Sequence, residues 1–184
     1  QSLAWRSNAV DTPADAIVGG GYPNVYAYRF DWDEQPSILG MDFSFLLGAG
    51  HGLEIPFVMG DFDFGKQTRF LFTKKNEYER NKLSKVIMQY WAHFAKKGYP
   101  SNESKNITLW DKWPKGGTNQ NRIMILDTEK SNAPRMSNGY VPHNKLVTIF
   151  ENDERSLKVD NKCNFLEDVY SWVDNWKSKN NFCQ

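Results

Sequence analysis

The clearest pattern of apolar and polar positions lies between residues 76 and 97, where apolar side chains return every three or four residues. That spacing places them on one face, so the sequence predicts a helix over this range. Asn76 with Glu79 resembles a capping box at its start, while Gly98 and Pro100 end it. The apolar face consists of Leu83, Val86, Ile87, Tyr90, Trp91, Phe94 and Ala95.

Two further helices follow from similar patterns. Residues 5–18 carry spaced apolar side chains, and Thr12-Pro13 suits an N-cap followed by proline in the first turn. Three glycines at 19–21 then stop the helix; because they precede a strand rather than a helix, we interpret them as a C-cap and turn, not a phosphate-binding loop. Residues 164–177 predict the last helix, again with one apolar face.

Strands are indicated by runs of β-branched and aromatic residues. Residues 25–30 form such a run, and residues 122–126 predict a second, short strand. Prolines and glycine mark residues 130–143 as a loop or insertion, while residues 147–150 could pair as an additional edge strand. His143 falls in the predicted loop, and nothing assigns it a chemical role.

Composition excludes several classes of function. Twenty-three basic residues face 22 acidic ones without a long run of one sign, which argues against binding to nucleic acid or to a membrane surface. No apolar run reaches the roughly eighteen residues of a membrane span, and no signal-peptide pattern opens the chain. A first residue of glutamine fits a processed or cleaved product and equally a chosen boundary.

The two cysteines and two sequons bear on the compartment. Cys163 and Cys183 could close a disulfide loop worth about 3 kcal/mol, or remain two free thiols. The sequons begin at Asn102 and Asn106, although such short patterns arise often by chance. Together these features slightly favour a secreted or periplasmic protein.

The candidate chemistry centres on residues 48–60, which place His51 between Gly50 and Gly52 ahead of an apolar run. Glycines allow a sharp turn, so the imidazole can project into a site. A lone histidine in a loop is usually structural, and the residue type alone does not favour catalysis. His93, off the apolar face of the predicted helix, is interpreted as a surface histidine rather than a metal ligand.

The segment that begins at His51 resembles the carboxylesterase type B (cholinesterase-like) family of α/β-hydrolases. In that family the catalytic histidine starts an H-G-x-E-[IL]-x-[FY]-[VL]-[FM]-G segment. Two further stretches, residues 25–32 and 83–98, resemble the family in the same order. The matching positions of the histidine segment are His51, Gly52, Glu54, Ile55, Phe57, Val58, Met59 and Gly60.

The resemblance covers most of this chain but only the C-terminal third of a typical family member. It implies an α/β fold in which residues 1–184 form the C-terminal part of an α/β-hydrolase domain, with the last sheet strands and their packing helices. A missing N-terminal segment or companion chain would complete the sheet. The order in these enzymes is serine in a G-x-S-x-G elbow, then acid, then histidine, and no G-x-S-x-G occurs here.

By this resemblance His51 is the catalytic base, and Glu54 orients the histidine loop through hydrogen bonds; a surface carboxylate is the competing interpretation of Glu54. Asp31 and Asp33 lie near enough in sequence to suggest the triad acid, but the family pattern instead favours solvated carboxylates at a strand end. Residues 37–47 either line the approach to His51 or form ordinary core. No cofactor and no metal are expected.

Two classes of function remain. The first is a serine carboxylic-ester hydrolase acting on a small, uncharged and partly apolar ester, with serine and acid on a companion polypeptide or N-terminal segment. The second is a catalytically inactive cholinesterase-like protein that uses the fold for binding or adhesion. Retention of His51 favours the enzyme, because an inert relative has no chemical need for a base there.

Overall fold

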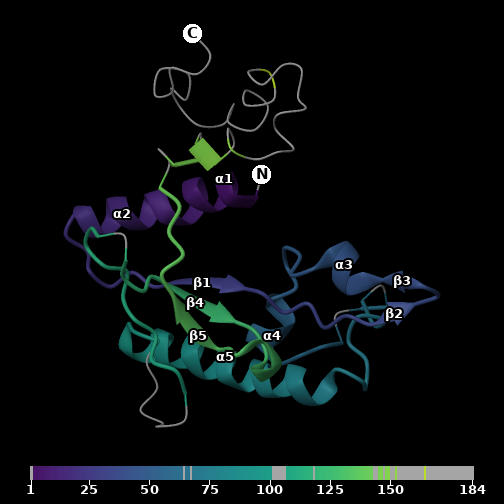
Figure 1. Ribbon diagram of the computed structural model, residues 1–184. Coiled ribbons are helices and arrows are strands. Elements are labelled where there is room, and N and C mark those ends of the chain that lie inside the picture. Colours follow the sequence, from purple (N-terminus) through teal and green to yellow (C-terminus); the bar gives the residue numbers. More distant parts are fainter. Residues whose placement is uncertain are drawn as a thin grey trace. The chain divides into compact units, whose positions relative to one another are not determined.

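The computed structural model describes residues 2–63, 65–66, 68–100, 107–117, 119–142, 145–146, 148–149, 152 and 164 (Figure 1). The chain divides into two compact units, one built from residues 1–22 and 139–184 and the other from residues 23–138. The assignment of residues 1–184 to one hydrolase domain therefore stays a prediction. The candidate chemistry lies in the second unit.

The first unit contains one continuous helical stretch, formed by α1 (Ser2–Arg6), a π-helical turn η1 (Ser7–Asp11) and α2 (Thr12–Gly19). The N-cap role predicted for Thr12 is wrong, because Thr12 is the first residue of α2 and Asp11 before it already has helical backbone angles, but Pro13 lies in the first turn as predicted. The Thr12 N–H donates to the carbonyl of Ser7, five residues earlier. This wider turn accommodates Pro13, which has no N–H to donate. The glycine C-cap is confirmed at Gly20.

The second unit is built on a mixed sheet in the order β1 (Ala27–Phe30), β4 (Ile123–Leu126) and β5 (Arg135–Ser137). Strands β1 and β4 are parallel, with Ala27 opposite Ile123 and Phe30 opposite Leu126. Both predicted strands are confirmed, and all four residues of β4 are buried, as expected for a central strand. The prediction of a loop over residues 130–143 is wrong in part, because β5 pairs antiparallel with β4.

Few residues of the C-terminal region, after residue 142, are described. Residues 148 and 149 are helical, so the predicted edge strand over 147–150 is wrong there. The Asn152 N–H donates to the Thr148 carbonyl, a spacing of one helical turn. Cys163 and Cys183, the sequon asparagines, His143 and all but the first residue of the last predicted helix lie outside the described residues.

Beyond the carboxyl end of β1 the chain forms a small hairpin, followed by two short helices and one long one (Figure 1). The hairpin consists of β2 (Ser37–Ile38) and β3 (Met41–Asp42), and α3 (Phe43–Leu47) follows it directly. Asp42 caps α3 by accepting hydrogen bonds from the backbone of Ser44 and Phe45. Helix α4 (Ile55–Met59) comes next, then α5 (Glu77–Lys97), the helix that the apolar periodicity predicts.

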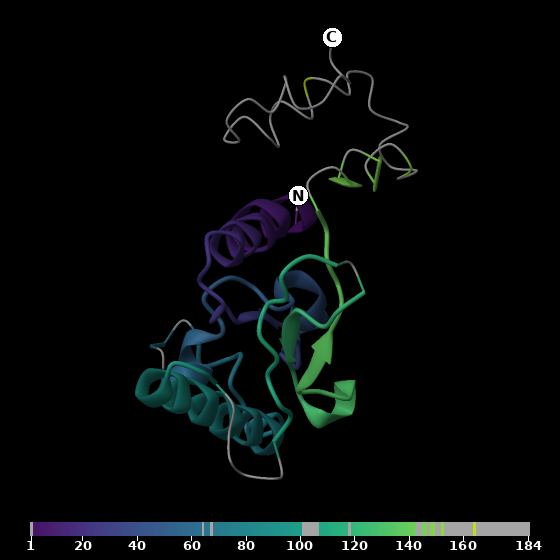
Figure 2. The same ribbon diagram turned by 90° about the vertical axis from the view of Figure 1, so that its left-hand side faces the viewer.

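Helices α4 and α5 cover one face of the sheet, and the core of the unit lies in between (Figures 1 and 2). Phe57 is fully buried there, with its ring centroid 5.0 Å from Trp32 and 5.1 Å from Phe30. The Ser84 hydroxyl donates to the Phe57 carbonyl at 2.8 Å, which ties α5 to α4. The buried core cluster comprises Trp32, Phe57, Leu83, Ile87, Tyr90, Trp110, Met124 and Leu126.

The predicted capping box of α5 is wrong at its first residue, because Asn76 makes no side-chain cap. Its amide nitrogen donates instead to the carbonyls of Glu34 and Leu71, and its oxygen accepts from Arg80. Asn76 is buried, so these bonds satisfy an amide that would otherwise be costly to bury. The helix ends as predicted, at Gly98 in the left-handed conformation.

Helices packed on a mixed sheet are consistent with part of an α/β fold, the coarser form of the fold prediction. Helix α5, the longest in the described part of the chain, carries charged residues throughout, and no described helix is long and apolar enough to cross a membrane.

Candidate functional site

His51 lies in a turn between α3 and α4, and its side chain is exposed. The turn starts at Gly48, the C-cap of α3, whose φ of 52° requires glycine. The buried Gln35 side chain donates to the Gly48 carbonyl at 2.8 Å, which ties the turn to the segment after β1. The Leu53 N–H donates to the Gly50 carbonyl and closes the turn. The expected glycine turn is thus present, and it presents His51 outward.

Glu54 follows at the start of α4, where its backbone carbonyl accepts hydrogen bonds from Phe57 and Val58. The side chain is half-buried and lies near Tyr28 of β1. Burial raises the pKa of the Tyr28 hydroxyl, and the negative charge of Glu54 raises it further. Glu54 is therefore electrostatically coupled to the strand that precedes the histidine turn. Its predicted hydrogen bonding within the turn stays a prediction.

The carboxylates after β1 have partners of their own. The Arg29 guanidinium donates two hydrogen bonds to Asp31, from Nε at 2.7 Å and from Nη2 at 2.5 Å. Asp33 is exposed. The buried Asp127, which follows β4, has a raised pKa. Burial is the main cause, and the charges of Asp33 and Asp31 raise the pKa further. This arrangement fits solvated carboxylates at strand ends, the interpretation that the sequence favours over a triad acid.

The hairpin and α3, which precede the His51 turn, expose a set of large apolar side chains. Leu39 is 95% exposed and Phe45 is 87% exposed, so ordinary core is the wrong interpretation for them. Leu39 also has a φ of 51°, an unusual conformation for a branched side chain. We call this surface the hairpin patch; it consists of Leu39, Met41, Phe45, Leu46 and Leu47. Apolar groups thus cluster on the segment that leads to His51.

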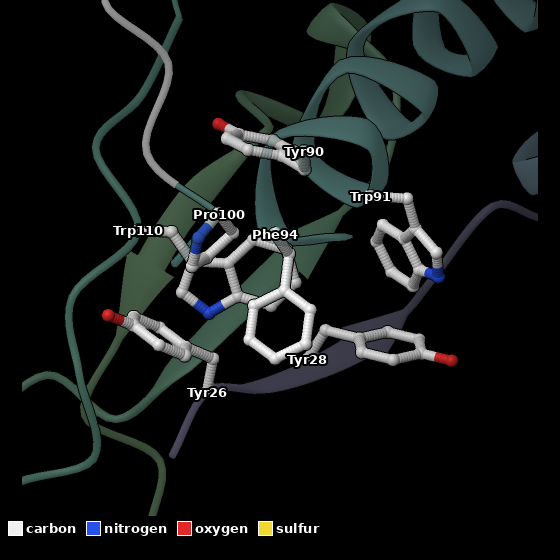
Figure 3. Close-up of a pocket in the computed structure, with 7 residues that line it drawn as sticks. All are labelled: Tyr26, Tyr28, Tyr90, Trp91, Phe94, Pro100 and Trp110. Atoms are coloured by element: carbon white, nitrogen blue, oxygen red, sulfur yellow. The ribbon is translucent and has the colours of Figure 1, made fainter. Parts of the chain in front are cut away.

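A pocket of about 180 Å³ lies between β1, the C-terminal half of α5 and Trp110 (Figure 3). Tyr26 and Tyr28 line it from one side, since alternate residues of a strand share a face. Phe94 and Trp91 line it from α5. His51 is not among the described residues that line the pocket.

The remaining histidine of the described residues, His93, has a structural partner. Its Nδ1 lies 2.8 Å from the Tyr99 carbonyl, to which it donates, and the two rings are in contact. Among the described residues, no three His, Cys, Asp or Glu side chains gather so as to hold a metal ion.

Sequence reasoning missed three parts of this region. The Gln35 tether has no sequence signal, because its partner is a backbone carbonyl thirteen residues away. The proximity of Glu54 to Tyr28 depends on how β1 packs against α4. The aromatic pocket had a usable signal, namely the alternation of Tyr26 and Tyr28 in a predicted strand followed by a helix rich in aromatic residues.

Comparison with known proteins bears on this arrangement. The model of the carboxylesterase family matches residues 8–144, which include β1, the His51 turn, α5 and β4. The chain belongs to the carboxylesterase family. The resemblance inferred from the His51 segment is thereby confirmed.

Similar carboxylesterase-family proteins come from an animal and a bacterium. Acetylcholinesterase of Danio rerio is 27% identical over an alignment of 190 positions, which covers 97% of this chain and 27% of that protein. Para-nitrobenzyl esterase of Bacillus subtilis (strain 168) is 33% identical over 128 residues, which cover 69% of this chain and 22% of that protein. A solved structure of a PNB esterase is 34% identical with a TM-score of 0.39, and the match covers 56% of this chain and 18% of that one. The chain thus spans about a quarter of the length of these relatives.

Proposed function

We propose that this chain supplies the triad histidine of a serine carboxylic-ester hydrolase, while a companion polypeptide or N-terminal segment supplies the nucleophilic serine and the acid. One observation carries the proposal: His51 stands exposed on a turn that Gln35 ties to the segment after β1. A catalytic base must reach groups outside its own segment, and a tethered, outward-facing imidazole can do so.

In the proposed reaction His51 acts first as a base. One ring nitrogen takes the proton of the serine hydroxyl as the serine oxygen attacks the ester carbonyl, and the other nitrogen donates to the carboxylate of the companion segment. His51 then returns the proton to the departing alcohol. Water then attacks the acyl-enzyme, again with His51 taking its proton, and the carboxylic acid product is released. The chemistry requires no cofactor.

The surroundings of His51 support a companion. Strand β1 is at the edge of the described sheet, with a partner on one side only. The hairpin patch is apolar and exposed next to the turn. Unpaired strand edges and clustered apolar side chains are features that protein contacts usually cover. The sequence contains no G-x-S-x-G elbow, so the nucleophile must come from elsewhere.

Glu54 has a supporting role in this proposal. Its half-buried carboxylate lies at the start of α4, three residues after His51 and near Tyr28. A carboxylate at this point can accept hydrogen bonds that hold the end of the turn. Glu54 would then orient the turn rather than exchange protons with the substrate.

The second candidate function is a catalytically inactive cholinesterase-like binding or adhesion protein. The hairpin patch supports it, because an exposed apolar surface suits partner binding with or without catalysis. The two functions differ in whether the companion contains a reactive serine.

A tagged fluorophosphonate tests the choice, because it labels activated serines covalently. The native preparation is treated with the probe, resolved on a denaturing gel and measured by intact mass. We expect label on a segment other than residues 1–184, at a rate that His51→Ala lowers at least about a thousandfold. His93→Ala serves as the matched control and should leave labelling unchanged. The contacts described for His93 are both with Tyr99. Equal labelling of the His51→Ala protein would overturn the proposal, and absence of label on any segment would favour the binding protein.

A further inference from the structure

Three buried polar side chains follow one face of α5 at intervals of four residues: Asn76 just before the helix, then Arg80 and Ser84. Residues four apart on a helix lie on the same face, one turn after another. None of the three is more than 5% exposed, although polar side chains are costly to bury without partners. We call them the polar stripe. Their hydrogen bonds all lead to segments near the His51 turn.

Asn76 holds the segment that follows β1. Its amide nitrogen donates to the Glu34 carbonyl at 2.9 Å and to the Leu71 carbonyl at 2.8 Å. Two donors meet its amide oxygen, the Thr73 N–H at 3.1 Å and the Arg80 guanidinium at 2.5 Å. Because these groups can only donate, the oxygen must face them and the nitrogen must face the two carbonyls. The direction of the amide is therefore fixed.

The contact with Glu34 reaches the His51 turn through one further residue. Gln35 comes next in the chain, and its side chain donates to the Gly48 carbonyl at 2.8 Å. Glu34 is also held by its side chain, because its Oε1 accepts from the Thr128 hydroxyl at 2.8 Å. Residues 34–35 are thus fixed to α5 and to the segment after β4, and Gln35 extends from this fixed point to the start of the turn.

Ser84 holds the chain on the other side of the turn. Its hydroxyl donates to the carbonyl of Phe57 in α4 at 2.8 Å. At the end of α4 the backbone lies close against α5, since a Cβ on Gly60 would meet the sulfur of Met88 at 2.7 Å. Helix α4 follows the His51 turn directly in sequence. Helix α5 therefore fixes the chain both before and after the histidine.

We propose that Asn76 and Ser84 are positioning residues for His51, which hold the two ends of its turn on α5. This role rests on the proposed function, because the position of His51 matters most if its ring must meet groups on another segment. A base must lie within hydrogen-bond reach of the proton that it takes, and a displacement of about 1 Å can lower the rate about a hundredfold. Both residues act through the backbone carbonyls that they contact.

A double-mutant cycle, measured by amide hydrogen exchange, tests the path from Asn76 to the turn. Asn76→Asp loses the donating nitrogen and keeps the oxygen that Arg80 contacts. We expect about fivefold faster exchange at Leu53, whose N–H bonds to the Gly50 carbonyl in the turn. In a chain that already carries Gln35→Glu, the same substitution should add less than about twofold, because both residues act on one path.

Ser84→Ala should give the opposite result in its own cycle. It should speed exchange at Ile55, where the turn meets α4, about fivefold. This effect should multiply with that of Gln35→Glu, because the two side chains hold opposite ends of the turn. Each rate is expressed relative to the Trp113 amide, which bonds to the Val25 carbonyl at 2.8 Å, so that a general loss of stability cancels.

Fluorophosphonate labelling in the presence of the companion separates positioning from stability. Asn76→Asp and Ser84→Ala should each lower the labelling rate at saturating probe at least about tenfold. The probe concentration for half-maximal rate should stay unchanged, because the base is displaced and the probe site is not. Asn81→Asp is the matched control: it makes the same chemical change at a half-exposed position of α5 and should alter neither exchange nor labelling.

Unchanged relative exchange at Leu53 in the Asn76→Asp chain would refute the positioning role, and so would full multiplication of its effect with that of Gln35→Glu. Labelling at the unsubstituted rate despite faster exchange would refute it as well. If no segment takes the label, the proposed esterase function fails, while the two exchange cycles still decide whether α5 holds the turn. The two proposals therefore fail separately.

Discussion

Asp127 is a buried carboxyl group at the end of the central strand. Burial is the main cause of its raised pKa, and the charges of Asp33 and Asp31 add to it. The backbone N–H of Thr128 donates to its Oδ1 at 2.7 Å, which offsets part of this effect. The folded chain therefore holds the Asp127 proton more strongly than the unfolded chain does.

The sign of the pH dependence follows from this difference. Below the unfolded pKa of about 3.9 the group is protonated in both states, and as the pH rises through the folded pKa the buried charge lowers the free energy of unfolding. Asp127→Asn carries no such charge. We predict that the free energy of unfolding of the Asp127→Asn chain, minus that of the unsubstituted chain, increases between pH 3.5 and pH 7. Urea unfolding at both pH values measures this difference. Asp111→Asn, at an exposed position, should change the free energy of unfolding by less than about 0.5 kcal/mol at either pH. A difference for Asp127→Asn that shrinks with rising pH would contradict the prediction.

At the scale of elements, the His51 turn depends on a side chain from another segment. Gln35→Glu replaces a donor to the Gly48 carbonyl by a group that, when ionised, can only accept. We predict about tenfold faster hydrogen exchange at the amides of Leu53 and Ile55, whose bonds close the turn, because losing such a buried bond costs roughly 1.4 kcal/mol.

Two controls apply to this prediction: an amide far from the turn in the same chain, and the same substitution at another glutamine. The Gly98 amide, bonded to the Phe94 carbonyl at the far end of α5, should exchange at an unchanged rate. Gln89→Glu makes the same chemical change at an exposed position of α5 and should leave the turn as it is. Unchanged exchange at Leu53 in the Gln35→Glu chain would mean that the turn holds its shape without the tether.

The sequence predicts some elements well and others poorly, for reasons of length and packing. Helix α5 repeats its apolar spacing over 21 residues, and β4 is an unbroken apolar run, so each carries its own signal. Strand β5 has three residues, among them Arg135, and exists because β4 offers it backbone partners. The pair Thr12-Pro13 predicts an N-cap at Thr12, but helical backbone continues into α2 from a π-helical turn before it, which no local pattern indicates.

The candidate site divides in the same way. The glycines around His51 predict its turn, and the segment from His51 to Gly60 carries the family resemblance that the family match confirms. The Gln35 tether and the hydrogen bond from Asn76 to Glu34 depend on distant segments meeting in space. Exposure of Leu39 and Phe45 could not be read from their apolarity, because an apolar run predicts burial unless its partner surface is absent.

At the scale of the whole molecule, substitutions in the hairpin patch test whether this surface binds the companion. Leu39→Ser with Phe45→Ser should weaken association with the companion at least about tenfold, since fully burying each side chain is worth about 1.5–3 kcal/mol. Both positions are almost fully exposed, so the fold of residues 23–138 should be retained. Co-purification through a tag on this chain, followed by quantification of the partner band, measures the effect.

Leu109→Ser is the control, because Leu109 is 65% exposed and lies outside the hairpin patch. It should leave co-purification at the level of the unsubstituted chain. An equal yield of partner with the doubly substituted chain would place the companion on some other surface.

The parallel pairing of β1 with β4 also sets the order of events during synthesis. Partners Ala27 and Ile123 are 123 − 27 = 96 positions apart. At ribosomal rates of about 5–20 residues per second, β1 emerges roughly 5–20 s before the strand that it pairs with. For that time β1 lacks its partner β4, and closing so long a loop slows folding further. Slow synthesis of this segment therefore prolongs the time that β1 spends without β4 and favours aggregation over folding.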